Sequence, residues 1–528
     1  MVDNVETDRD ARRGKDKQIY RRLMRNTISN YAGAFFDIAV GFLMTPFLLH
    51  HLGVATFGIW MLVSSLAGYG KLFDFGIYGA VTKYVAEYRA TGEIEQGRRL
   101  ISASLFLYMI LGLAVVVLSV AIAPLFPDLF NVPDADRTTA VRTVILMGVW
   151  VGLSVTCAAP GAILQGLHRF DALNLVQMLG VVVSTTAMVV VLLLGGGIVG
   201  LAMANIATTL VSRSLMLWLA NRFAPELRPG WRDFDRASIR KVISFSSSIF
   251  MGQLAKRLQT KTDLIVIGVI MSASSVTPYG IAWRLSESTR RIVTQFSKAL
   301  LPMASELHAQ GDDRRLRSLY IMSVRLTLVI SLAIAGVFIG LAGPFLTVWV
   351  GAEFAEYSYL VTLLMLAAII SLSQWPAAAI LQGMARYRLL AISAVISGLV
   401  NLALSILLGL QFGLIGVALG TLIPTTVESF GFILPYTMRV LGFTLRDVIH
   451  DIVVPSVVPA LPAAGLLYLL VHAIVPETLI EIATIAAISI LAYVVGYLSV
   501  GASTDERSAY RSFALTTIRF AGARLRRT

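Results

Sequence analysis

Long apolar stretches without charged residues recur along the chain. Residues 101–124 and 172–197 contain no Asp, Glu, Lys or Arg, and each exceeds the roughly 20 residues that a helix needs to cross the hydrocarbon layer of a membrane. Backbone polar groups in lipid must be satisfied within the chain, so such stretches are predicted to be helices. The pattern predicts about 14 membrane spans, which begin near residues 27, 55, 100, 141, 172, 197, 242, 277, 319, 357, 388, 413, 452 and 480.

Two segments recur at a spacing of about 217 residues. Residues 162–166 (AILQG) recur as residues 379–383, and Gly197-Ile198-Val199-Gly200 recurs as Gly413-Leu414-Ile415-Gly416. Six predicted helices separate the two copies, so both copies have the same orientation in the membrane. The repeat therefore predicts two parallel six-helix bundles related by an axis along the membrane normal.

The predicted fold is an all-α polytopic membrane protein with two six-helix bundles and two additional C-terminal helices. An even number of spans puts both termini on one side, and both termini are rich in Arg, which predicts that both face the cytoplasm. The predicted divisions are a basic cytoplasmic arm at 1–25, an N-terminal bundle at 26–222, a cytoplasmic linker at 223–241, a C-terminal bundle at 242–440, two additional helices at 441–502 and a basic cytoplasmic tail at 503–528.

Composition and charge support a membrane protein. Hydrophobic residues make up 56% of the 528 residues and charged residues only 14%, whereas a soluble protein has about 25% charged residues. The net charge of +13 would favour nucleic-acid binding in a soluble chain. Here the basic residues lie at the ends and alternate connections of the apolar runs, as the positive-inside rule requires, so no nucleic-acid partner is predicted.

Residues near the start of the chain resemble a known family of transporters, and as architecture the resemblance extends over the first 12 predicted spans. The resemblance lies in the run 26–53, in Phe57-Gly58-Ile59-Trp60, and in Phe73-Asp74-Phe75-Gly76-Ile77, which leads into residues 82–87 (TKYVAE). These residues resemble the polysaccharide transporter branch of the multidrug/oligosaccharidyl-lipid/polysaccharide exporter superfamily, which includes O-antigen, lipopolysaccharide and exopolysaccharide repeat-unit flippases. The resemblance implies two lobes around a central cavity that opens alternately to each side.

The same resemblance implies a substrate and a location. The expected cargo is a polyprenyl-pyrophosphate-linked oligosaccharide that moves across the bacterial cytoplasmic membrane. Expected partners are membrane lipid, H⁺ or Na⁺ as a coupling ion, and a polysaccharide polymerase or other glycan-assembly proteins. Two alternatives are a cation-coupled multidrug antiporter of the same superfamily and a membrane-embedded glycosyltransferase or polymerase.

The seventh predicted span carries deep positive charges. Lys256, Arg257 and Lys261 lie 12 or more residues into it, roughly 18 Å at 1.5 Å per residue, with Asp263 close behind. Each charge would cost about 2.5–3.5 kcal/mol if it faced lipid. These side chains are therefore expected to face protein or water.

The eighth predicted span continues this polar surface. Arg284, Glu287 and Arg291 are spaced by three and four residues, which places them on one helical stripe. A guanidinium presents paired donors to two phosphate oxygens. We therefore predict a cationic substrate-binding cavity, partly neutralised by Asp263 and Glu287, whose basic members are Lys256, Arg257, Lys261, Arg284 and Arg291.

Other charged residues have simpler interpretations. Asp37 lies near the middle of the first span, where a carboxylate needs a cation, a proton or water. It is either a member of a structural ion pair or the site that couples transport to an ion. Lys71 and Asp74 are interpreted as an interfacial pair at the cytoplasmic end of the second span. Arg213, Arg325 and Glu428, also near cytoplasmic ends, are interpreted as structural.

The sequence offers no signal for catalysis. Cys157 is the only cysteine, so a disulfide or a cysteine metal site is excluded. Residues 195–200 match G-x-G-x-x-G but follow a predicted membrane span, so they are interpreted as a turn. No Walker phosphate loop, H-E-x-x-H motif or nucleophile elbow is present. We predict that the chain is not an enzyme and binds no cofactor or metal.

Overall fold

The computed structural model describes residues 3–230, 235–246, 262–297, 300–503 and 506–507. Within these residues the regular structure is helical, with no β-strand, which confirms the predicted all-α class. The chain divides into two compact units, Met1–Thr277 and Pro278–Thr528.

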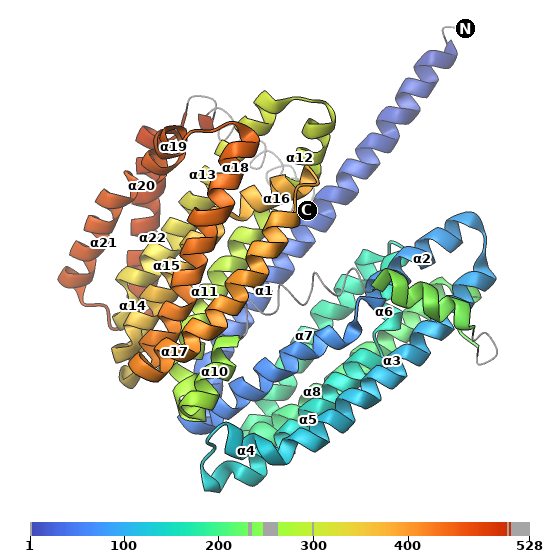
Figure 1. Ribbon diagram of the computed structural model, residues 1–528, viewed down its shortest axis with the longest axis horizontal. Helices are drawn as coiled ribbons and strands as arrows, with labels where there is room; N and C mark the ends of the chain where they lie inside the picture. Colours follow the sequence, from blue (N-terminus) through green and yellow to red (C-terminus); the bar gives the residue numbers. More distant parts are fainter. Residues whose placement is uncertain (1–2, 231–234, 247–261, 298–299, 504–505, 508–528) are drawn as a thin grey trace, which may run out of the picture. The chain divides into compact units, whose positions relative to one another are not determined.

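The first unit is a bundle of long helices joined by short turns (Figure 1). A further helix at residues 236–246, called the linker helix here, lies beside α2. The label η marks a short 3-10 or π segment. The elements are α1 Asp3–Tyr69, η1 Gly70–Asp74, α2 Ile77–Thr91, α3 Ile94–Ile122, η2 Ala123–Leu125, α4 Phe126–Leu129, η3 Asp134–Asp136, α5 Arg137–Thr156, α6 Ala159–Gly166, α7 Phe170–Leu193, α8 Gly197–Phe223, η4 Pro225–Leu227 and α10 Thr262–Ile270.

The second unit is also a helical bundle, and α11 begins just before its boundary (Figure 1). The segment with Pro455, Pro459 and Pro462 is broken into short pieces, as its prolines predict. The elements are α11 Ala273–Ser297, α12 Leu300–Ala309, α13 Asp313–Gly340, α14 Ala342–Val350, η5 Ala352–Tyr357, α15 Ser358–Ser373, α16 Trp375–Gly383, α17 Arg388–Thr426, η6 Val427–Ile433, α18 Leu434–Leu441, α19 Leu445–Val448, η7 Ile449–Val453, α20 Val454–Val457, α21 Ala460–Ile474, α22 Leu479–Gly496 and η8 Tyr497–Gly501.

Ten stretches of the described residues are long and apolar enough to cross a membrane. Two of them reverse direction at a glycine, α1 at Gly53 (φ 73°, ψ 167°) and α17 at Gly413 (φ 62°, ψ −139°) (Figure 1). Each of these two stretches therefore supplies two crossings. The chain is a multi-pass membrane protein, and the count of about 14 spans stays a prediction.

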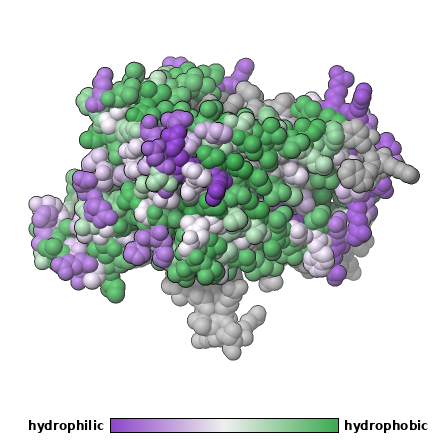
Figure 2. All heavy atoms as spheres, turned by 90° about the horizontal axis from the view of Figure 1, so that it is seen from below, coloured by the Kyte–Doolittle hydropathy of each residue, from purple (hydrophilic) through white to green (hydrophobic). Residues whose placement is uncertain are grey.

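The surface of the helices suits a lipid environment. Large apolar side chains are exposed on α3 and α7, including Leu113 and Leu193, each 65% exposed. Figure 2 shows broad hydrophobic areas on one face of the molecule, with hydrophilic residues gathered in separate clusters. A water-soluble protein rarely exposes such large apolar patches, whereas hydrocarbon stabilises them.

The sequence repeat corresponds to a repeated backbone turn. Helix α6 ends at Gly166 and α16 ends at Gly383, and a left-handed residue follows two positions later, His168 (φ 56°) and Ala385 (φ 58°). In both copies the left-handed residue donates its N–H three residues back, at 2.9 and 3.0 Å, to the carbonyl oxygens of Gln165 and Gln382. Identical backbone geometry in the two units supports a common origin for the two segments.

Candidate functional site

The predicted polar stripe of the eighth span is present on α11. Arg284 and Glu287 are half-buried and Arg291 is exposed. The Arg291 Nε lies 3.6 Å from Glu287 Oε1 across one helical turn. Two guanidinium groups and one carboxylate on the same face leave a net positive charge. That face can bind a phosphate through paired N–H donors.

The opposite face of α11 fixes the orientation of this stripe. Ser286 Oγ donates a hydrogen bond of 3.1 Å to the Leu364 carbonyl of α15, and Val293 is fully buried. At the same edge of the helix, Arg290 Nη1 donates to Ser371 Oγ at 3.2 Å. Since α15 anchors this side, rotation of α11 about its own axis is opposed. Arg284, Glu287 and Arg291 therefore occupy a defined face.

The other predicted site residues do not lie on α11. Three of them are outside the described residues, and two are on α10 and α1. Lys256, Arg257 and Lys261 lie outside the described residues. Asp263 is half-buried on α10, and Asp37 is exposed on α1; both carboxylates take part in interactions with other groups. A single cationic cavity built from all five basic residues stays a prediction.

Asp74 has a structural role that sequence reasoning missed. Its carboxylate accepts a hydrogen bond of 2.6 Å from the hydroxyl of Tyr108, a residue of α3 with no exposed surface. It also accepts from the backbone N–H groups of Gly76 and Tyr78, each at 3.2 Å. These bonds hold the break between η1 and α2, where Gly76 has a φ of 85°. The side chain of Lys71 lies outside the described residues, so the proposed Lys71–Asp74 pair stays untested.

An acidic side chain directly before a helix start was the one available signal for this role. Asp commonly accepts from the first N–H groups of a helix, and Asp74 precedes α2 by three residues. The partnership with Tyr108, however, joins residues 34 positions apart. No periodicity in the sequence reports that contact.

The contacts of Arg325 confirm the structural role predicted for it. Arg325 is 12% exposed and lies 2.9 Å from Glu506, which is 7% exposed. Its Nε also donates to the Asp451 carbonyl. A second arginine of α13, Arg317, lies 3.0 Å from Asp447. Both contacts join α13 to the helices that follow the second bundle, and the Glu506 pair is the more deeply buried.

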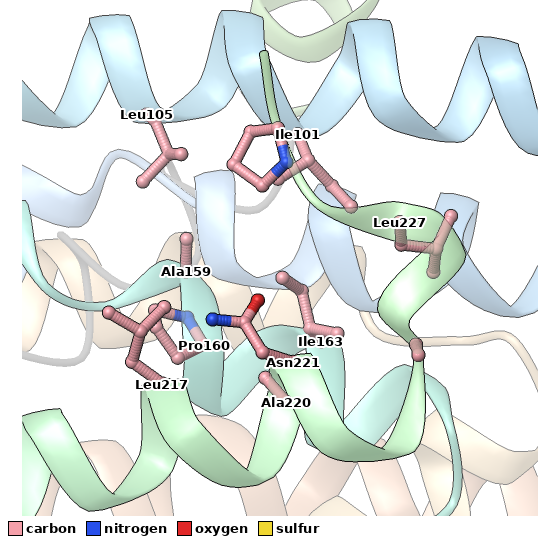
Figure 3. A pocket seen from close by; sticks show the side chains of 11 residues that line it. Ile101, Leu105, Ala159, Pro160, Ile163, Leu217, Ala220, Asn221 and Leu227 are labelled. Carbon is pink, nitrogen blue, oxygen red and sulfur yellow. The ribbon is translucent and has the colours of Figure 1, made fainter.

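A small apolar pocket lies near the end of α8 in the first unit. It is lined by Ile101 and Leu105 of α3, by Pro160 and Ile163 of α6, and by Asn221 of α8, whose amide lies among apolar side chains (Figure 3). The cavity volume is about 30 Å³, room for roughly one or two water molecules. It is too small for a sugar, so it is not the transport cavity.

Curated relatives resemble this chain over most of its length. The uncharacterized membrane protein EpsK of Bacillus subtilis is 22% identical over 436 residues, which cover 81% of this chain and 86% of EpsK. The probable low-salt glycan biosynthesis flippase Agl15 of Haloferax volcanii is also 22% identical, and the match covers 77% of this chain and 82% of Agl15.

Solved structures share the fold. The lipid II flippase MurJ, in an inward closed conformation, aligns with a TM-score of 0.70 over 90% of this chain and 97% of MurJ, at 16% identity. An inward-facing multidrug resistance MATE family transporter of the MOP superfamily aligns with a TM-score of 0.65 over 78% of this chain and 94% of that protein, also at 16% identity. At this identity the alignments establish the fold alone.

A family model identifies the chain at the level of sequence. The model described as "Polysaccharide biosynthesis protein" matches residues 52–359, more than half of the 528 residues. The match includes α2, α11 and both of the first repeat segments. It confirms the resemblance seen in the opening residues. The chain belongs to the polysaccharide biosynthesis protein family described by that model.

Proposed function

We propose that this protein is a flippase that moves lipid-linked oligosaccharides, carried on polyprenyl pyrophosphate, across the cytoplasmic membrane for cell-surface polysaccharide synthesis. The observation that carries the proposal is the cationic stripe of Arg284, Glu287 and Arg291 on α11. An anionic head group is the ligand that this stripe suits. A relative named as a probable glycan biosynthesis flippase and another named as a probable flippase each match about three quarters of the chain, and they support the same class of cargo.

The proposed mechanism is alternating access. A head group that carries a pyrophosphate and sugars cannot cross hydrocarbon alone, since buried charges and hydroxyl groups lose their hydration. Fixed guanidinium donors would replace that hydration inside a cavity, while the polyprenyl chain stays in lipid. Lys256, Arg257 and Lys261 are proposed to add positive charge to the same cavity.

The proposal also covers the membrane location of the protein, its coupling ion and its partners. The protein is proposed to lie in the bacterial cytoplasmic membrane with both termini in the cytoplasm, because its basic residues gather at both ends. Asp37 is proposed to bind H⁺ or Na⁺ or to form a structural ion pair. A polysaccharide polymerase and other glycan-assembly proteins are proposed partners. The chain itself is proposed to catalyse no reaction.

A multidrug antiporter is the alternative that the fold allows, because a MATE transporter shares it. A cationic drug is best bound by carboxylates and aromatic rings. The described stripe on α11 instead carries two arginines for one glutamate. Its net positive charge favours an anionic cargo.

Transport into vesicles tests the proposal. The purified full-length chain is reconstituted into lipid vesicles, and movement of a fluorescent polyprenyl-pyrophosphate-linked sugar from the outer leaflet is followed beside a cationic dye. Protection of the lipid-linked sugar from an added glycosidase is the expected result. Movement of the dye without movement of the lipid-linked sugar would favour the antiporter and reject the flippase.

A further inference from the structure

Two lysine side chains meet over one tyrosine ring in the first unit. The Nζ of Lys83, on α2, lies 4.4 Å from the centroid of the Tyr84 ring, and the Nζ of Lys241, on the linker helix, lies 4.6 Å from the same centroid. The two nitrogens can be no farther apart than the sum of these distances, about 9 Å. Two ammonium groups therefore converge from elements that are more than 150 residues apart in the sequence.

The rings beneath these ammonium groups form a fixed platform. Tyr84 is 7% exposed and Tyr88 is 4% exposed. Their rings stack at 5.9 Å with an interplanar angle of 22°, and Phe245 of the linker helix meets Tyr84 edge-on at 5.7 Å. The Nζ of Lys241 also donates a hydrogen bond of 2.6 Å to the hydroxyl of Tyr88. The Lys241 ammonium is thus held in place, unlike a freely moving surface lysine.

The positive charge of this cluster is only partly compensated. Glu87 Oε2 lies 3.6 Å from Lys83 Nζ. Among the side chains that the structure describes, no carboxylate lies within 4 Å of Lys241 Nζ. The hydrogen bond to Tyr88 raises the pKa of Lys241, so its ammonium is charged at neutral pH. One positive charge is left over, and Lys83 is 48% exposed, so an anion can approach it from outside.

The linker helix extends the positive surface. Arg236, Arg240 and Lys241 are exposed, and the helix contains no acidic residue from 236 to 246. Asp235 precedes it, and the backbone N–H of Ala237 lowers the pKa of that carboxyl by hydrogen bonding. The Asp235 carboxylate is therefore hydrogen-bonded to the N-terminus of the linker helix.

An exposed apolar side chain points to a lipid rather than a free anion. Ile243 is 54% exposed and follows Arg240 by three residues and Arg236 by seven, so these three residues share one face of the helix. A helix at a membrane interface combines basic side chains, which attract anionic head groups, with exposed apolar side chains, which enter the acyl boundary. We propose that Lys83 and Lys241 bind the phosphate of an anionic phospholipid head group, and that Arg236 and Arg240 on the adjacent face of the linker helix add positive charge beside it. This site shares no residue with the proposed cargo site on α11 and does not depend on the transport function.

The test measures lipid binding by the full-length protein. The purified chain in a neutral detergent is titrated with short-chain phosphatidylglycerol, with short-chain phosphatidylcholine and with inorganic pyrophosphate, and binding is followed by the shift in Tm. We expect phosphatidylglycerol to raise Tm through Lys83 and Lys241 and phosphatidylcholine to have little effect. Any shift caused by pyrophosphate, which the proposed cargo site on α11 can bind, should be unchanged in Lys83→Gln and Lys241→Gln. One surface lysine contributes about 1 kcal/mol to anionic-lipid binding. Lys241→Gln and Lys83→Gln are therefore each expected to weaken the apparent affinity about fivefold.

Two further variants separate charge from folding. Lys241→Arg keeps the charge and should retain phosphatidylglycerol binding, even if Lys241→Gln has a lower Tm without lipid. Arg314→Gln removes one exposed basic residue of α13 in the second unit and should leave the affinity unchanged. Unaltered affinity in both Lys83→Gln and Lys241→Gln would overturn the proposal. So would a stabilisation by pyrophosphate that is lost in Lys83→Gln and Lys241→Gln, because the site would then bind free anions.

Discussion

The hydroxyl of Tyr108 donates a hydrogen bond of 2.6 Å to the carboxylate of Asp74, and this contact ties the middle of α3 to the break before α2. Within the described residues three donors reach Asp74, two of them backbone N–H groups. A buried carboxylate needs such donors because it has lost water. The contact gives the opening of α2 a fixed direction.

Tyr108→Phe should destabilise the protein by about 1.5–3 kcal/mol, the range for a hydrogen bond to a charged group. The ring remains, so packing is little changed. The midpoint of thermal unfolding in detergent measures the effect. Tyr320→Phe is the control: Tyr320 is equally buried in the second unit, and its hydroxyl makes no hydrogen bond within the part of the chain that the structure describes. Equal losses in the two variants would show that the Asp74 contact adds nothing.

The glycines of the repeat should both resist substitution. A Cβ at Gly166 would lie 2.8 Å from the Thr82 carbonyl oxygen, and a Cβ at Gly383 would lie 2.8 Å from the Leu301 carbonyl oxygen. Both neighbours are backbone atoms that cannot turn aside. Gly166→Ala and Gly383→Ala are each expected to cost about 1–3 kcal/mol, as overpacking does.

Gly336→Ala is the matched control for these two substitutions. Gly336 lies within α13, and nothing lies within 4 Å of a Cβ added there. Alanine should then stabilise the helix by up to about 1 kcal/mol. Thermal unfolding of the three variants side by side tests the expectation. A loss at Gly336 as large as at Gly166 would contradict the role assigned to close helix contact.

The buried ion pair Arg325–Glu506 should contribute more to the stability of the second unit than the exposed pair Arg317–Asp447. Arg325→Ala leaves Glu506 buried without its partner, and such a loss costs about 3–5 kcal/mol. Arg317→Ala breaks the ion pair with Asp447, in which the Arg317 side chain is 39% exposed and the Asp447 side chain 32% exposed. This change should lower the stability by about 1 kcal/mol or less. Limited proteolysis of the last two helices reports the difference. Equal protease resistance in both variants would show that Arg325 does not anchor this segment.

Features that depend on neighbouring residues could be predicted from the sequence, whereas features that depend on tertiary contacts could not. The stripe of Arg284, Glu287 and Arg291 depends only on helical spacing, and α11 displays it. The repeated turn after Gly166 and Gly383 depends on a few adjacent residues, and both copies form it. The bond between Tyr108 and Asp74 depends on how α3 packs on α2, which spacing does not encode. Lys83 and Lys241 likewise meet through tertiary contacts, which spacing along the chain does not report.

Asp37 provides the test of ion coupling. Asp37→Asn removes an ionisable carboxyl with little change in shape, so transport should lose part of its dependence on pH or on sodium concentration. Transport of a lipid-linked sugar into vesicles is measured across a pH series and across a sodium series. A uniform fall in protein abundance with unchanged ion dependence would identify Asp37 as a member of a structural ion pair.

Arg284 gives the sharpest test of the proposed cargo site. It lies on the polar face of α11, seven residues from Arg291, and the repulsion between like charges on one helix face is reduced when an anion binds there. Arg284→Glu should abolish transport of a lipid-linked sugar, since the face would then carry two carboxylates and one guanidinium. Arg284→Lys should retain partial activity, because the charge survives while the paired donors are lost.

Membrane abundance must be measured beside transport, because a reversed charge in a helix bundle can also impair insertion. Arg315→Glu is the control: Arg315 is 75% exposed and lies 3.3 Å from Asp312 at the start of α13, so its reversal should leave transport near the level of the unaltered protein. Arg291→Glu extends the test along the same stripe. If Arg284→Glu and Arg291→Glu both transport the lipid-linked sugar normally at normal abundance, the cationic face of α11 does not bind the pyrophosphate.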